Sequence, residues 1–143
     1  METTWDGLPI AEDNPRFVSI VVWRRGPSGR EFLVLHRRHH GPDFAGEWAW
    51  TNPAGSRLPG EEVAVAARRE LLEEAGLELE LASVDLPNPE LAFYVAEAPA
   101  GAQVVLDHEH DRFEWVDVDE ARRRCLPAMV GDVFAAVNRL LRQ

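Results

Sequence analysis

The chain has 143 residues, an apolar content of 45% and a formal net charge of −10. This size and composition predict one globular domain with its own core. The acidic balance argues against a protein that wraps a nucleic-acid polymer, because such proteins present basic surfaces. No apolar run approaches the roughly 18 residues that span a bilayer, so we expect no membrane partner.

The N-terminal segment, residues 1–15, predicts an irregular arm, and residues 16–143 predict a single domain. The arm is acidic, contains glycine and proline, and lacks the basic and apolar regions of a signal peptide. The one cysteine, Cys125, excludes an internal disulfide and is typical of a reducing compartment. We therefore expect a cytoplasmic protein in which Cys125 is a small buried apolar residue and not a nucleophile.

Two strands are predicted at residues 16–25 and 31–38, where β-branched and aromatic residues dominate, and the turn "GPSG" between them makes a hairpin. A long loop, residues 39–60, follows with four glycines and three prolines. Loops of this length in a compact domain are usually functional or disordered. Three aromatic residues indicate that this loop is ordered, and each is a candidate for stacking on a nucleobase or for packing in the core. They are Phe44, Trp48 and Trp50.

A helix is predicted from about Glu61 to Ala75, with Gly76 as its C-cap. The segments after it alternate between strand-like and helical patterns without a regular βαβ order. This arrangement predicts an α/β fold with a mixed sheet between helices. The later strands are expected at the start of residues 77–86 and at residues 90–98, 101–106 and 111–118, and the later helices at residues 119–125 and 131–143.

The predicted helix carries three acidic side chains within one turn. Glu70, Glu73 and Glu74 share an arc of roughly 100° at 3.6 residues per turn, and two of them border the apolar face of Val63 and Ala67. Like charges at this spacing destabilise a helix. A solvated acidic face is one explanation, and a bound cation is the other, because carboxylates crowded beside an apolar face raise one another's pKa unless a cation neutralises them. Mg²⁺ prefers such oxygen ligands and keeps positions for water and substrate phosphates.

Residues 55–77 resemble the Nudix box, G-x5-E-x7-R-E-U-x-E-E-x-G-U, in which U is an aliphatic residue. Every fixed position of the motif matches at the required spacing, which makes the signal specific. The matching residues are Gly55, Glu61, Arg69, Glu70, Leu71, Glu73, Glu74, Gly76 and Leu77. The resemblance extends to "FLVLHRR" and "WAWTNPAG" around the start of the box and to "HEHDRFEWVDVDEA" after it. It departs from many members at Ser56.

The resemblance implies a Nudix-type α/β/α sandwich that hydrolyses a nucleoside diphosphate linked to another group. The implied cofactor is Mg²⁺ or Mn²⁺, and the implied partner is a small phosphoanhydride substrate. By position in the motif, Glu70 and Glu74 would bind the metal, and Glu73 would add a ligand directly or through water. The carbonyl oxygen of Gly55 would be a further ligand.

The same resemblance implies catalytic and supporting roles. Arg69 would orient the glutamates, and Glu61 would anchor the loop against the helix that Gly76 ends. A carboxylate must take a proton from the attacking water. Within this family that base comes from the helix or from a later loop, so Glu70 and Glu109 are both candidates.

Arg37 and Arg38 end the second predicted strand, where alternation sends their side chains to opposite faces. One of them is expected to bind the substrate phosphates, because a planar guanidinium suits bidentate contact. The other is expected to be solvated. The sequence does not distinguish the two.

Three other interpretations stay open. His108 and His110 form a His-x-His pair that could bind zinc, although the metalloprotease spacing and a third ligand are missing. A Nudix-fold sensor and an isomerase acting on isopentenyl diphosphate share the fold, but the intact box disfavours the sensor and the position of Cys125 disfavours the isomerase. The choice among nucleotide substrates stays open, and so does the oligomeric state, a homodimer included.

Overall fold

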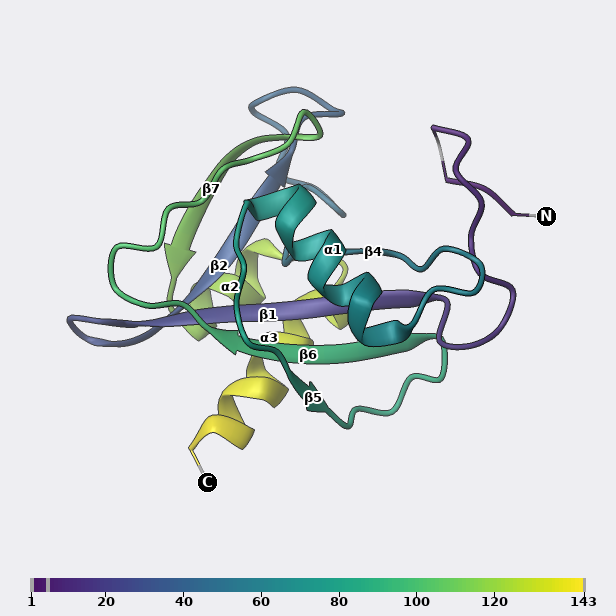
Figure 1. Cartoon of the computed structure of the whole chain (residues 1–143). Coiled ribbons are helices and arrows are strands. Elements are labelled where there is room, and N and C mark those ends of the chain that lie inside the picture. The colour runs from purple at the N-terminus through teal and green to yellow at the C-terminus, as the bar shows by residue number, and fades with distance from the viewer. Residues whose placement is uncertain (1, 5, 143) are drawn as a thin grey trace.

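The computed structural model describes residues 2–4 and 6–142 of the chain. A seven-stranded sheet lies between helices (Figure 1). In chain order the elements are β1 (Phe17–Gly26), β2 (Gly29–Arg37), β3 (Trp50–Thr51), β4 (Ala54–Ser56), α1 (Val63–Ala75), β5 (Ala82–Val84), β6 (Leu91–Glu97), β7 (His110–Val116), α2 (Val118–Arg124) and α3 (Ala128–Leu141). The mixed sheet between helices confirms the fold class that the sequence predicts.

The sheet is organised around β1. Strands β1 and β6 run parallel, whereas the other pairs are antiparallel. The order is β3-β2-β1-β6-β5, with β4 also paired to β1 and β7 to β2. Because β1 has neighbours on both edges and helices over both faces, residues 18–23 are all buried, as in other doubly covered strands.

The two faces of the sheet carry separate cores. Helix α1 packs on one face, and α2 and α3 pack on the other (Figure 1). Strand alternation divides β1 between them. Val18, Ile20 and Val22 join the cluster beneath α1, and Val21 and Trp23 join the cluster that includes α3.

Residues 50–56 form a crossing segment, in which the chain passes from an edge beside β2 to a position beside the start of β1. Strand β3 pairs with β2, and β4 pairs with the start of β1. Between them the buried side chain of Asn52 donates from Nδ2 to the Ile20 carbonyl oxygen at 3.0 Å and to Ser19 Oγ at 2.8 Å. The sequence does not predict these strands, because segments of two and three residues show no measurable alternation.

Two strand predictions after α1 are wrong. Residues 101–106 form no ladder with another strand, and residues 77–86 form one only at Ala82–Val84. In both segments alternate apolar residues pack on the core beneath α1. Burial of one side of an extended chain produces the same alternation as a strand, whether or not a hydrogen-bonded neighbour is present.

The boundaries of α1 differ from the predicted ones at one end. The helix begins at Val63, two residues after the predicted start, and ends at Gly76. Gly76 has φ +67°, the left-handed conformation that favours glycine at a C-cap. None of the helices in the described part of the chain is long and apolar enough to cross a membrane.

The buried side chain of Arg57 ties the N-terminal segment to the loop before α1. Its guanidinium donates to the carbonyl oxygens of Asp13, Pro15 and Glu61, each at 2.8 Å. These bonds satisfy a cation that is 4% exposed. The division of the chain into an arm and a domain stays a prediction.

Candidate active site

Arg69 joins the glutamates of α1 to the loop that precedes the helix. Its Nε lies 2.8 Å from Glu61 Oε2 and its Nη2 lies 2.9 Å from Glu61 Oε1, a bidentate pair. Nη1 donates to Glu70 Oε1 at 3.0 Å and lies 3.3 Å from Glu73 Oε2. Nη2 also donates to the Ser56 carbonyl oxygen at 2.9 Å. The bond from Arg69 lowers the pKa of Glu61 despite its partial burial.

Glu70 lies against the backbone of β4. A Cβ atom at Gly55 would overlap the Glu70 carboxyl group, so the glycine is required for this approach. Glu70 is 9% exposed. Burial raises its pKa to about 7, with Glu73 adding to the rise and Arg69 opposing it.

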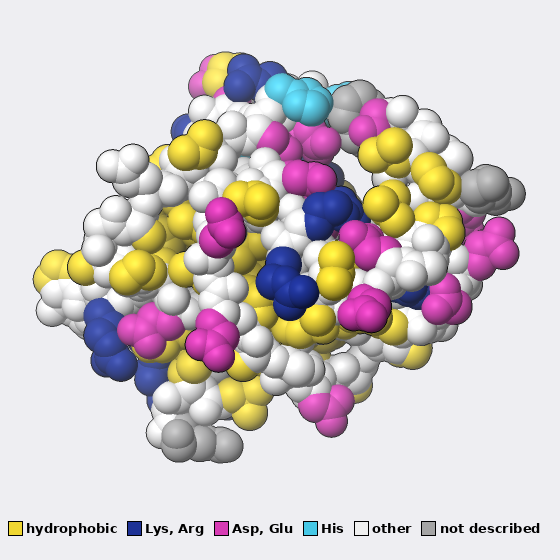
Figure 2. Space-filling view, in the orientation of Figure 1, with side chains coloured by type: hydrophobic (Ala, Val, Ile, Leu, Met, Phe, Trp, Pro, Cys, Tyr) yellow, Lys and Arg dark blue, Asp and Glu magenta, His cyan; other side chains and the backbone are white. Residues whose placement is uncertain are grey.

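Glu74 lies one turn further along α1 and contacts the same crossing segment. Its Oε1 accepts from the Ala54 backbone N–H at 3.0 Å. Burial holds the pKa of Glu74 well above its usual range, and the neighbouring carboxylates of Glu70, Asp107 and Glu109 add to the rise. We call Glu70, Glu73, Glu74 and Glu109 the acidic centre. Figure 2 shows acidic side chains gathered beside a histidine near one end of the α1 face.

Glu109 reaches the acidic centre from the loop before β7. Burial is the main cause of the raised pKa values of Glu70 and Glu74, and the charge of Glu109 makes a smaller contribution to both. The Glu109 carbonyl oxygen accepts from the Arg38 backbone N–H at 2.8 Å. The neighbouring His110 is buried, with Nδ1 2.7 Å from Asp107 Oδ1.

The donor set of the acidic centre suits a hard divalent cation. Carboxylates and the Gly55 carbonyl oxygen are the ligands that Mg²⁺ and Mn²⁺ prefer. A cation would also relieve the burial and mutual repulsion that raise the pKa values of Glu70 and Glu74. Within residues 2–4 and 6–142, however, no three His, Cys, Asp or Glu side chains form a ready-made cage. The oxygen ligands of the acidic centre therefore suit such a cation in their chemical type, but they are not arranged as a complete cage. The ligand roles of Gly55, Glu70, Glu73 and Glu74 stay predictions.

A cleft with two compartments adjoins the acidic centre. The helix compartment, about 490 Å³, lies between the sheet and α3 and is lined by Asn52, Phe93 and Met129 among others. The loop compartment, about 550 Å³, is lined by residues 37–40, Phe44, residues 48–49 and residues 108–109. Arg37 and Trp48 line both compartments, so these two side chains stand at their junction.

The two arginines at the end of β2 have different environments. Arg38 is tied down, because Nε donates to the His108 carbonyl oxygen at 3.1 Å and Nη2 to the His110 carbonyl oxygen at 3.2 Å. The Arg37 side chain is exposed at the junction and has no ion pair in the described part of the chain. Both arginines border the loop compartment, because β2 ends at Arg37 and strict alternation stops there. Arg37 is therefore the cation best placed to meet a phosphate.

The three aromatic residues of the long loop also differ. Trp50 is 5% exposed and packs in the core with Arg112 and Arg124 over its ring. Trp48 is 46% exposed and has φ +67°, a conformation that is costly for a residue with a side chain and that clusters at functional sites. Phe44 is half-buried at the edge of the loop compartment. Trp48 and Phe44 thus border the cleft, and Trp50 does not.

The sequence analysis missed part of the cleft wall. Asn52 and one face of α3 line the helix compartment. No chemical motif marks them, because they carry an amide and apolar side chains of ordinary type. The asparagine beside proline in "WTNPAG" was the one available signal.

The comparison with known proteins agrees with the fold and the family. The sequence matches the NUDIX domain family over residues 15–135. The fold is therefore that of the Nudix hydrolases, and this chain belongs to the Nudix family, as the box predicts. Nudix hydrolases in general use divalent metal ions.

Individual relatives give a closer view. A protein described as octanoyltransferase of Myxococcus xanthus is 40% identical over 139 residues, which cover 85% of this chain and 36% of that protein. The chain therefore spans about a third of that relative. The asymmetrical bis(5'-nucleosyl)-tetraphosphatase of Caenorhabditis elegans is 29% identical over 137 residues, covering 85% of this chain and 93% of that protein. The crystal structure of a C. elegans Ap4A hydrolase binary complex has a TM-score of 0.69 at 25% identity and covers 87% of this chain and 96% of that one.

Proposed function

We propose that the protein is a divalent-metal-dependent pyrophosphohydrolase acting on a nucleoside diphosphate linked to another group, of the nucleoside triphosphate or dinucleoside polyphosphate type. One observation carries this proposal: the acidic centre borders, through Glu109, a cleft with Arg37 and the exposed Trp48 at its middle. The similarity to the C. elegans tetraphosphatase supports the substrate class.

The residues of the chain provide a place for the phosphates and for the attacking water. Mg²⁺ or Mn²⁺, held by the acidic centre and the Gly55 carbonyl oxygen, would neutralise charge on the phosphates and lower the pKa of a water. Arg37 would bind a phosphate at the junction of the two compartments. Arg69, by pairing with Glu61 and Glu70, keeps the Glu70 carboxylate against Gly55.

Two carboxylates can take the proton from water. Glu70 is buried beside Gly55 within the acidic centre, where its carboxylate could accept a proton from water. Glu109 lines the loop compartment. Comparison of the pH–rate profiles of Glu70→Gln and Glu109→Gln distinguishes them, because loss of the base removes the acidic limb of the profile.

The paired compartments favour a substrate with bulky groups on both sides of its phosphates. Each has a volume of several hundred Å³, as ligand pockets commonly have. A dinucleoside polyphosphate would fill both with nucleosides, and Trp48 would offer a stacking surface at the junction. A nucleoside triphosphate would fill one.

The alternative functions have less support. Cys125 is buried in the cluster of α2 and α3, and burial raises the pKa of its thiol to about 12, so it does not serve as the active cysteine of an isomerase. A sensor would bind the same ligands without turnover. Localisation in the cytoplasm and assembly as a homodimer stay predictions.

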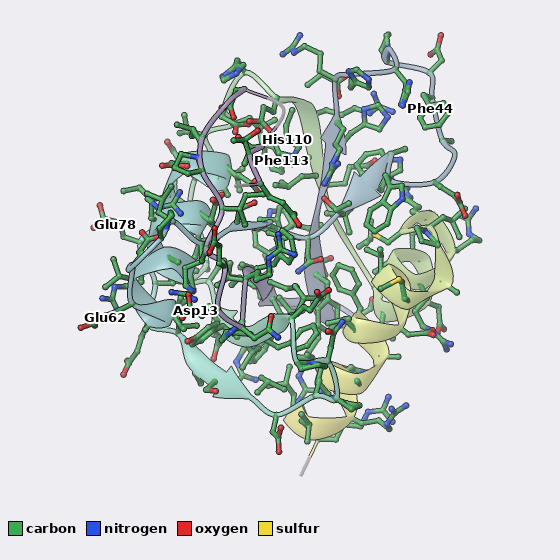
Figure 3. The ribbon with its side chains drawn as sticks, turned by 90° about the vertical axis from the view of Figure 1, so that its right-hand side faces the viewer. Asp13, Phe44, Glu62, Glu78, His110 and Phe113 are labelled. Carbon is green, nitrogen blue, oxygen red and sulfur yellow. The ribbon has the colours of Figure 1, made fainter. Side chains whose placement is uncertain are left out.

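The test is a set of nucleoside triphosphates, dinucleoside polyphosphates and sugar nucleotides incubated with Mg²⁺ or Mn²⁺ and followed by phosphorus NMR. We expect cleavage of a phosphoanhydride that stops on chelation and falls by about a hundredfold or more in Glu74→Gln. Glu78→Gln is the matched control, because Glu78 lies just past α1 and projects away from the sheet (Figure 3). Ligand binding without cleavage would favour the sensor.

A further inference from the structure

Two side chains of the sheet hold the backbone of the loop that forms one compartment. His36, on β2, is fully buried, and its Nε2 lies 2.7 Å from the Phe44 carbonyl oxygen. Arg112, on β7, donates from Nη1 to the Pro42 carbonyl oxygen at 2.8 Å. Figure 3 shows Phe44 on this loop, on the opposite side of the molecule from Glu62 and Glu78. The loop that carries Phe44 and Trp48 is thus attached through its backbone.

The ring of His36 also contacts β7. Its Nδ1 lies 2.7 Å from Asp111 Oδ1, and its Nε2 lies 2.7 Å from the Phe44 carbonyl oxygen. Arg112 Nη1 lies 3.7 Å from Asp111 Oδ1. His36, Asp111 and Arg112 therefore form one connected group of polar side chains beside the loop.

A further contact joins Arg112 to the same ring. Arg112 Nη1 lies 3.5 Å from His36 Nδ1, at the outer limit of a hydrogen bond. The ring is also packed edge-on against Trp50, with the ring centres 4.9 Å apart, so it is held in one orientation.

A β-bulge brings Asp111 to this position. His36 pairs with Arg112 and Arg37 with His110, so Asp111 is the extra residue on β7. Bulges redirect a side chain next to active sites. Here the bulge brings the Asp111 carboxyl group to the buried His36 side chain. The next residue on β2, Arg37, lines the cleft.

We propose that His36, Asp111 and Arg112 form a clamp that positions the loop compartment by holding the backbone of Pro42 and Phe44. All three are positioning residues, since none lines the cleft. The clamp holds the loop whose side chains His39, His40, Phe44 and Trp48 line the compartment. It acts on the binding of the substrate group that enters there and not on the acidic centre. The kinetic part rests on the proposed function, whereas the attachment of the loop does not.

The direct test is hydrogen–deuterium exchange of the substrate-free protein across residues 41–48. We expect His36→Phe, which retains a buried ring but removes the bond to the Phe44 carbonyl oxygen, to exchange faster there than the wild-type protein. Should His36→Phe not fold, Arg112→Gln makes the same measurement through the Pro42 carbonyl oxygen. Unchanged exchange across these residues would overturn the clamp.

The kinetic test uses Asp111→Asn and Arg112→Gln, with Arg25→Gln as control because Arg25 is an exposed arginine far along β1. We expect each clamp variant to raise KM by about threefold to tenfold, with kcat within about twofold. Faster amide exchange across residues 41–48 should accompany the change. Unchanged KM and exchange, or a fall in kcat alone, would contradict the clamp. If the wild-type protein cleaves no substrate, the proposed function fails, while the exchange measurement still decides the clamp.

Discussion

Arg69 shows how one side chain organises several charges. Its guanidinium contacts Glu61 on both oxygens, Glu70 and Glu73, and the Ser56 carbonyl oxygen. The Glu61 and Glu70 side chains are each only 11% exposed, so their charges depend on this partner. A partly buried carboxylate that loses its cation has a large uncompensated desolvation cost.

We expect Arg69→Met to lower the free energy of unfolding by about 2 kcal/mol, because it leaves the Glu61 and Glu70 carboxylates without their cation. Urea denaturation of the metal-free protein measures this change. Arg68→Met is the matched control, because Arg68 is the adjacent residue of α1 and is exposed. Equal effects of the two substitutions would contradict the role assigned to Arg69.

We expect the Cys125 thiol of the native protein to resist alkylation. Burial raises its pKa to about 12, so less than about one thiol in a thousand is ionised at pH 8. Mass spectrometry after iodoacetamide treatment should find modification in urea but not in buffer. Rapid labelling of the folded protein would show that the thiol is accessible and reactive.

At the scale of elements, the site depends on the close approach of β4 to α1. The crossing segment holds Glu74 through the Ala54 N–H and receives the Glu70 carboxyl group over Gly55. The lack of a side chain at position 55 is what allows the Glu70 carboxyl group to lie so near β4. The positions of Glu70 and Glu74 therefore depend on both α1 and β4, and not on the helix alone.

We expect Gly55→Ala to destabilise the protein by about 1–3 kcal/mol and to lower kcat roughly tenfold to a hundredfold, because the new methyl group displaces the Glu70 carboxylate. Thermal unfolding and steady-state kinetics measure the two effects. Ser56→Ala is the neighbouring control on β4, since Ser56 contacts Arg69 through its carbonyl oxygen and not its side chain. Wild-type kcat in Gly55→Ala would show that the close approach is dispensable.

At the scale of the whole molecule, the buried carboxylates link folding, pH and metal binding. The pKa of Glu70 is raised from 4.5 to about 7, and that of Glu74 is also raised. The folded protein therefore binds these protons more tightly than the unfolded chain does. Their contribution to stability is full below the unfolded pKa and is lost as the pH rises through the folded pKa.

We expect the metal-free protein to lose about 1 kcal/mol of stability between pH 6 and pH 8 through Glu70 alone, which corresponds to a few degrees in Tm. Mg²⁺ should raise Tm more at pH 8 than at pH 6, because it competes with the protons. Thermal scans with and without Mg²⁺ measure both effects, and Glu70→Gln should flatten the pH dependence. A larger effect of Mg²⁺ at pH 6 would contradict this linkage.

The spacing of residues along the chain was sufficient to predict features that lie within one helix or one strand. The positions of Glu70, Glu73 and Glu74 on one helical arc follow from 3.6 residues per turn, and the C-cap at Gly76 follows from its lack of a side chain. The central strands were predictable because long apolar runs are buried on both faces. The strand predicted at residues 101–106 failed because alternation reports burial and not pairing.

By itself, therefore, the sequence determined the family, the mixed sheet between helices and the acidic face of α1, because each depends on periodicity or on fixed spacing within one segment. Only the tertiary structure decided that Arg37 stands at the junction of two compartments while Arg38 is tied to the β7 loop. It also decided that Trp50 is core and Trp48 borders the cleft, and that a bulge joins Asp111 to His36. These relations join residues distant in the chain, and their geometry comes from strand register and packing, which no local pattern encodes.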